Sequence, residues 1–179
     1  MDDLTRLAHE AGTGDPEAIR TFVRRAQPAV WQLCTGLVGR EHADDLTQDA
    51  FIRILRALPA FRGESTARTW MLRITRYTCA DWIRAQQRRR RLDGEVAGRA
   101  NVVTPAATGQ VEIDDLLDRL PPNRRDAFLL TQVLGLSYAE AAAICGCEVG
   151  TIRSRVARAR MALVDELGGQ ATGTAEGDA

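Results

Sequence analysis

The sequence contains no lysine, so all 24 of its basic residues are arginines. It has no apolar run near the ~20 residues of a membrane span, and its first 30 residues show no signal-peptide core. We therefore expect a cytoplasmic protein that does not contact a membrane. There is also no nucleophile with a partner base, no pair of catalytic carboxylates and no phosphate-binding loop. We expect no enzyme activity and no small-molecule substrate.

Cysteines are few, and they do not follow the spacing of a metal site. Cys145 and Cys147 are too close for the usual C-x-x-C pattern, and both histidines are distant in sequence. We expect no bound metal and no cofactor. The thiols should be reduced and pack as small hydrophobes, with a Cys145–Cys147 disulfide as the less favoured alternative.

The segment 135–163 is typical of a helix-turn-helix, in which a second helix enters the DNA major groove. Ser137 is followed three residues later by Glu140, the capping box that begins a helix. Gly146 supplies the turn, and a second helix should run to about Leu167.

This second helix has an apolar side and an arginine-rich side. The apolar stripe repeats at the helical period and comprises Val149, Ile152, Val156, Ala159 and Leu163. Thr151, Ser154 and Arg158 lie opposite, with Arg153 and Arg155 on the two flanks, suited to base edges and phosphates. The alternative is a core helix with a solvated arginine face. We favour DNA binding.

The formal net charge of zero hides a segregation of charge along the chain. Residues 59–91 carry 9 arginines against two acids, and residues 148–163 carry 4 against one. Residues 1–58 are slightly acidic, with 7 arginines and 9 acids. Two separate basic segments indicate two contacts with a polyanion.

The first basic segment predicts a helix from Ser65 or Thr66 to about Gln87. One of its faces gathers an aromatic ring among arginines: Arg73, Arg76, Tyr77 and Arg84. Guanidinium groups that follow phosphates, beside a ring that stacks on a base, suit single-stranded nucleic acid. The alternative is a solvated helix with a half-buried Tyr77.

A preceding helix, expected from Asp44 or Asp45 to Leu58, displays Asp45, Gln48 and Asp49. Acids at a helix start are favourable because they complement the helix dipole. The same acids repel DNA. If this face is functional, we expect it to bind a protein.

The periodicity predicts an all-α protein of two small helical domains, at residues 1–91 and 111–167. Residues 92–110 should form a flexible linker, and residues 168–179 a disordered tail. Pro28 predicts a kink or a break in the helix that begins at Pro16.

Together these motifs resemble an RNA polymerase sigma factor of the extracytoplasmic-function (ECF) type. DDLTQDAFIRILRAL at 44–58 resembles region 2.2, which docks on the clamp helices of the β′ subunit. Residues 61–89 resemble regions 2.3 and 2.4, which open and read the −10 element. Residues 120–163 resemble region 4, whose helix-turn-helix reads the −35 element.

The resemblance implies a role for each matching position. The core-polymerase contact falls on Asp45, Gln48 and Asp49. The −10 contact falls on Phe61, Arg62, Gly63, Arg73, Arg76, Tyr77 and Arg84. The −35 contact falls on Thr151, Arg153, Ser154, Arg155 and Arg158. Tyr77 stands where some members carry Asn, so the −10 base preference cannot be copied from them.

The implied partners are core RNA polymerase, through its β′ and β subunits, and promoter DNA, duplex at −35 and single-stranded at −10. Members of the family are commonly held inactive by an anti-sigma factor, and no residue here identifies one. Two other functions stay open at this point. One is a stand-alone helix-turn-helix regulator, and the other is a sigma mimic that sequesters an anti-sigma factor.

Overall fold

Every regular element in the part of the chain that the structure describes is helical, which confirms the predicted all-α class. The structure, a computed structural model, describes residues 2–94 and 113–172. Its helices are α1 (Asp3–Gly12), α2 (Pro16–Val38), α3 (Arg40–Ala57), α4 (Ala67–Gly94), α5 (Ile113–Asp118), α6 (Pro122–Phe128), α7 (Tyr138–Cys145) and α8 (Val149–Thr172). A 3-10 turn at Leu58–Ala60 follows α3, and a π turn at Leu129–Val133 follows α6.

Side-chain caps fix where α1, α2 and α4 begin. Asp2 accepts a hydrogen bond from the Thr5 amide at 2.9 Å, and Asp15 accepts one from the Glu17 amide at 2.9 Å. The Thr66 hydroxyl accepts the Thr69 amide at 3.1 Å, which confirms the predicted start of α4. Each cap satisfies a backbone donor that the first turn of a helix leaves free.

Several helix limits differ from the predictions. The sequence analysis did not identify α1, and the predicted break at Pro28 does not occur, because α2 continues through it. Pro28 is exposed, so water can satisfy the carbonyl that loses its partner. α4 continues past Gln87 to Gly94, since arginine is a good helix former. Residues 92–94 of the predicted linker and 168–172 of the predicted tail are helical, as the ends of α4 and α8, and the rest of both segments lies outside the described residues.

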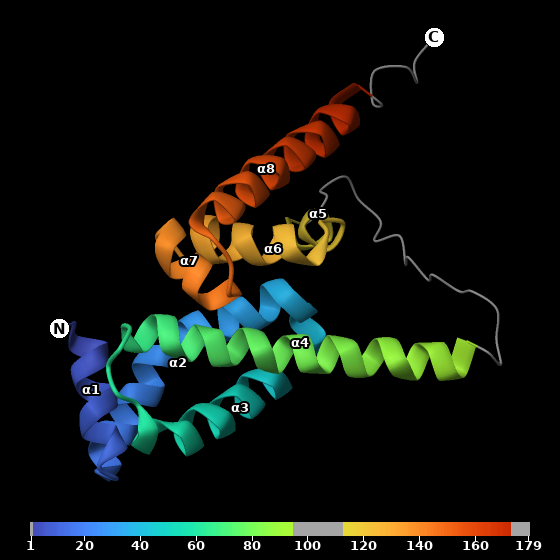
Figure 1. Cartoon of the computed structure of the whole chain (residues 1–179). Helices are drawn as coiled ribbons and strands as arrows, with labels where there is room; N and C mark the ends of the chain where they lie inside the picture. The colour runs from blue at the N-terminus through green and yellow to red at the C-terminus, as the bar shows by residue number, and fades with distance from the viewer. Residues whose placement is uncertain (1, 95–112, 173–179) are drawn as a thin grey trace.

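The helices form two groups that pack directly on each other. α1–α4, the N-terminal domain (residues 2–94), enclose Phe22, Leu33 and Ile54, while α5–α8, the C-terminal domain (residues 113–172), enclose Ile144 and Ile152. In Figure 1 the C-terminal domain lies over α2 and α4. The buried apolar residues of both domains, apart from Leu116, belong to one continuous core.

A close approach of α2 to the π turn marks the contact between the domains. A Cβ atom at Gly36 would lie only 2.6 Å from Cδ2 of Leu129, so any larger residue here would have to displace the Leu129 side chain. The Arg68 guanidinium adds a hydrogen bond of 2.6 Å to the Leu134 carbonyl. Nothing in the sequence pattern predicted this packing.

Candidate nucleic-acid and protein interfaces

The helix-turn-helix is built as its sequence predicts. The Ser137 hydroxyl accepts the Glu140 amide at 3.2 Å, and Glu140 accepts the Ser137 amide at 2.9 Å, which completes the capping box. The Ser137 hydroxyl and amide both lower the pKa of Glu140. Gly146 ends α7 in the left-handed conformation, with φ 65° and ψ 43°. α8 therefore leaves the turn in a fixed direction.

The outward face of α8 is open to solvent. Arg153, Ser154 and Arg158 are exposed, while Ile152 and Val156 are buried against the domain. The Ser154 hydroxyl donates to the Thr151 carbonyl at 3.0 Å, so it stays on its own helix. Within the described part of the chain, no carboxylate pairs with Arg153 or Arg158. This face is available to a ligand.

The remaining two predicted residues of α8 are less open. Thr151 is half-buried at the start of the helix. Arg155 is also half-buried, and its guanidinium lies 3.6 Å from the Cys147 sulfur. Arg155 is thus turned toward the body of its own domain, unlike Arg153 and Arg158.

A hollow of about 270 Å³ forms between the loop after the 3-10 turn and the first turns of α4. It brings together four of the residues predicted for the −10 contact, Phe61, Arg62, Gly63 and Arg73. Trp70 also lines the hollow, with its ring centroid 5.0 Å from that of Phe61. Trp70 was not among the residues predicted for this contact, because its spacing fits the buried side of the helix.

The other three predicted −10 residues lie outside this hollow. Tyr77 is 49% exposed, one turn after Arg73. Arg84 pairs with Asp81 at 2.6 Å. Arg76 donates from Nε to Asp126 of the C-terminal domain at 2.6 Å. The predicted set is therefore divided between an open hollow and the contact between the domains.

The Arg76–Asp126 pair is largely removed from solvent, with side chains 20% and 12% exposed. Burial lowers the pKa of Arg76, but the attraction and hydrogen bond of Asp126 outweigh it and raise that pKa overall. Burial raises the pKa of Asp126 against the attraction of Arg76. Arg76 and Arg84 also border a cavity of about 290 Å³ between the domains.

The predicted protein-binding face of α3 is exposed as expected. Asp45, Gln48 and Asp49 all reach solvent. Ile52, which the sequence analysis missed, shares this face and is 47% exposed. Its position three residues after Asp49 and four after Gln48 was the available signal, because residues so spaced are neighbours on a helix. An apolar side chain within an acidic rim suits a protein partner.

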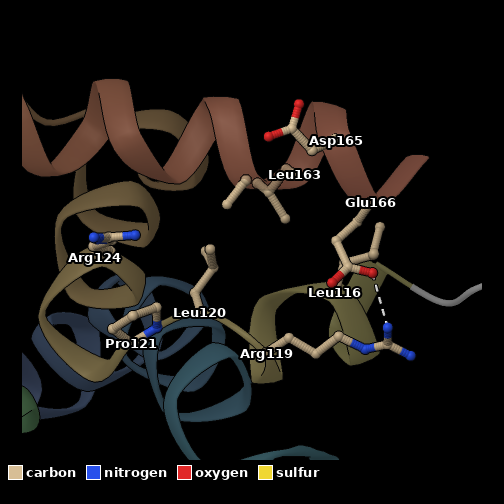
Figure 2. A pocket seen from close by; sticks show the side chains of 9 residues that line it. Leu116, Arg119, Leu120, Pro121, Arg124, Leu163, Asp165 and Glu166 are labelled. Atoms are coloured by element: carbon tan, nitrogen blue, oxygen red, sulfur yellow. Dashed lines mark hydrogen bonds and ion pairs between the residues drawn. The ribbon is translucent and has the colours of Figure 1, made fainter. Parts of the chain in front are cut away.

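A groove of about 590 Å³ lies between α5, the start of α6 and α8. Figure 2 shows Leu116, Leu120 and Leu163 directed toward it. The Arg119–Glu166 ion pair, 2.8 Å long, closes one end. Helical periodicity puts Leu163 on the side of α8 away from Ser154, so the groove and the arginine face are separate surfaces.

The cysteines that the structure brings together are not the pair considered from the sequence. Cys34 of α2 and Cys79 of α4 are buried with their sulfurs 3.7 Å apart. Burial raises the pKa of Cys145 to about 11, which leaves little reactive thiolate at neutral pH. All four cysteines are free thiols. In the described ranges, no helix is long and apolar enough to cross a membrane.

Comparison with known proteins defines the class first. Residues 22–89 match the model of Sigma-70 region 2, and residues 110–163 match that of Sigma-70, region 4. The two matches coincide with the two helical domains. They identify a sigma factor with both promoter-facing regions, which sets aside the stand-alone helix-turn-helix regulator.

Whole-chain relatives then define the group within that class. The chain is 43% identical over 171 residues to the ECF RNA polymerase sigma factor SigC of Mycobacterium tuberculosis, covering 90% of this chain and 89% of the relative. It is 34% identical to the ECF RNA polymerase sigma-E factor of Escherichia coli, covering 90% and 92%. The protein belongs to the ECF sigma factors.

Solved structures agree with this assignment. The sigma factor RpoE of Bartonella quintana, in complex with the anti-sigma factor NepR, matches with a TM-score of 0.70 and 29% identity over 83% of this chain and 96% of that one. CnrH, in complex with the cytosolic domain of CnrY, matches with a TM-score of 0.71 and 26% identity over 93% and 99%. As an ECF sigma factor, the protein binds core RNA polymerase and directs initiation at specific promoters.

Proposed function

We propose that the hollow beside Trp70 takes a base from the melted −10 strand. Its volume of about 270 Å³ accommodates an unstacked base, and the half-buried Trp70 ring, which packs against the buried Phe61 ring, offers a surface against which a base can stack. Arg62 and Arg73, both exposed, lie where they can contact the phosphates of that strand. Tyr77, exposed one turn further along α4, offers a second ring.

The second part of the proposal assigns the −35 element to α8. Arg158 and Ser154 face outward at the centre of the exposed side, where side chains reach base edges in a major groove. Arg153 lies on the flank, where phosphates are found. Thr151 and the half-buried Arg155 then border this contact.

The third part assigns core polymerase to two surfaces. Asp45, Gln48 and Asp49 around Ile52 form the contact with the β′ clamp helices. The apolar groove between α5 and α8 receives an element of the β subunit, on the side away from the −35 face. By likeness to the sigma factor RpoE, solved in complex with the anti-sigma factor NepR, we also propose an anti-sigma factor as a regulator.

The observation that carries the proposal is that one chain presents three separate surfaces of different chemical character. They are the hollow lined by Trp70 and arginines, the arginine face of α8, and the acidic face of α3 around Ile52. Run-off transcription with purified core polymerase, with and without this protein, tests it on genomic fragments. Core binding without initiation at any promoter would favour the sigma mimic.

A charge-reversal pair tests the polymerase surface. Asp49→Arg should weaken core binding at least tenfold, while the matched control Glu17→Arg, an exposed acid on α2, should leave core affinity unchanged. Circular dichroism checks that both variants fold. Equal core affinity of the two variants would remove α3 from the contact.

A further inference from the structure

The C-terminal end of α4 extends past the body of the N-terminal domain. α4 is 28 residues long, and Figure 1 shows its last turns reaching beyond α2 and α3. The side chains from Arg88 to Leu92 are all exposed. The core therefore does not require this part of the helix.

Four consecutive arginines, Arg88–Arg91, occupy this end. Two earlier arginines of the domain, Arg53 and Arg84, share the single carboxylate of Asp81 at 2.8 and 2.6 Å. No described carboxylate pairs with any arginine of the 88–91 run. A positive charge near a helix C-terminus is favourable with the helix dipole, but that effect does not call for four consecutive arginines.

The length of α4 indicates which part of a promoter this end would meet. From Arg73 at the hollow to Arg88 and Arg91 the helix rises about 22–27 Å, at 1.5 Å per residue. That span corresponds to roughly seven base pairs of duplex at 3.4 Å each. The chain then continues to the C-terminal domain, whose proposed target lies further upstream.

We propose that Arg88–Arg91 bind the phosphates of duplex DNA between the −10 and −35 elements. The inference rests on the proposed function, because it takes the hollow as the −10 site. Successive arginines on a helix point about 100° apart, so two or three of the four can reach one duplex. Recognition is by charge alone, and the base sequence of this spacer should not matter.

The test uses holoenzyme formed with the wild-type chain or with R88Q/R89Q/R90Q/R91Q, and a promoter fragment that carries both elements. Glutamine keeps helix propensity and removes the charge. Losing two or three phosphate contacts should reduce the slope of log affinity against log salt by about 2–3. The control R6Q/R20Q/R24Q/R25Q removes the same charge from exposed positions of α1 and α2 and should leave the slope unchanged.

A second DNA, with neutral methylphosphonates in the spacer, tests whether Arg88–Arg91 contact the phosphates of that segment. Wild-type holoenzyme should lose affinity on this DNA, and the 88–91 variant should lose nothing further. An unchanged salt slope would overturn the inference, and so would an equal loss on a single-stranded −10 oligonucleotide without spacer. If wild-type holoenzyme itself fails to select the promoter, the proposed function is what fails.

Discussion

The two helices that carry the proposed DNA contacts, α4 and α8, are presented in opposite ways. On α8, Ser154 and Arg158 face solvent. On α4, Arg76 is bonded to Asp126 of the C-terminal domain, and Arg68 is bonded to the Leu134 carbonyl. The proposed −35 reader, α8, is therefore open, whereas part of the proposed −10 reader, α4, is held against the C-terminal domain.

Because of this difference, exposing Arg76 of α4 to DNA costs free energy, whereas the outward face of α8 is already exposed. For Arg76 to contact a phosphate, it must first leave a carboxylate that is already a good anionic partner. The Asp126 side chain is 12% exposed, so opening also returns a buried carboxylate to water. We expect full −10 contact to require separation of the two domains.

The largest expected effect comes from breaking this pair with Asp126→Ala. Removing one partner leaves Arg76 mostly buried without its counter-charge, so we expect the contact between the domains to lose about 2–4 kcal/mol. Small-angle scattering should show a larger radius of gyration, and urea unfolding should show the lost stability. The double variant with Arg76→Ala should recover part of the loss.

Arg119→Ala is the matched control, because its pair with Glu166 is 55% and 41% exposed. An exposed pair contributes at most about 1 kcal/mol. Asp126→Ala could instead lower the unfolding free energy no more than Arg119→Ala and leave the scattering profile unchanged. In that case the Arg76–Asp126 pair would not be what holds the C-terminal domain against α4.

The next effect concerns the open reader. Arg158→Ala should reduce discrimination at one base pair of the −35 element by about 1–3 kcal/mol, because it removes a side chain at the groove-facing centre of α8. Arg153→Ala, on the flank, should weaken binding equally for all sequences and reduce the salt slope by about 1. Binding to a set of −35 variants distinguishes the two. A uniform loss with both variants would refute base reading by Arg158.

A smaller effect is expected from pH at the Glu140 cap of the helix-turn-helix. Because the capping hydrogen bonds lower the pKa of Glu140, its carboxylate stabilises the folded helix-turn-helix above the ordinary value of 4.5. That contribution, about 1 kcal/mol, should be lost as pH falls below 4.5 and through the lowered pKa. The difference in unfolding free energy between wild type and Glu140→Gln should shrink across this range. A constant difference would contradict the assignment.

The smallest expected effect is that of Gly36→Ala, which combines two opposing contributions. Alanine favours α2 by about 1 kcal/mol over glycine. Its Cβ, however, would lie 2.6 Å from Cδ2 of Leu129, so the domain contact must adjust. We expect a net loss of under about 1 kcal/mol in urea unfolding. Gly150→Ala in α8, where a Cβ meets open space, is the control and should stabilise. An equal gain in stability for both variants would mean that the Leu129 side chain moves aside without an energetic cost.

Local signals in the sequence predicted the open reader well. The Ser137–Glu140 capping box, the turn at Gly146 and the two sides of α8 depend on residues within a few positions of each other. The structure confirms them, except that Val149 of the predicted apolar stripe is 38% exposed. The four hollow residues at 61–73 were also predicted as part of one contact, and the structure brings them together.

The covered reader was not predictable in the same way. Arg76 and Asp126 are 50 positions apart, and neither periodicity nor charge sums indicate which acid meets which arginine. Ile52 was not predicted, because it lies outside the buried stripe of α3. Single exposed apolar residues are common on protein surfaces, so its position alone does not indicate a function. The Arg76–Asp126 pair and Ile52 both belong to surfaces that meet another domain or a proposed partner. The apolar periodicity of a single helix carries no information about such contacts.

The position of Trp70 has a practical consequence. All three tryptophans, Trp31, Trp70 and Trp82, belong to the N-terminal domain, and residues 113–172 contain none. Intrinsic fluorescence of the free protein therefore reports on one domain only. Since Trp70 lines the hollow beside Phe61, a base that enters it should quench this emission, while Trp31 and Trp82 provide a steady background. The proposed entry of a −10 base can therefore be followed by tryptophan emission, without any attached label.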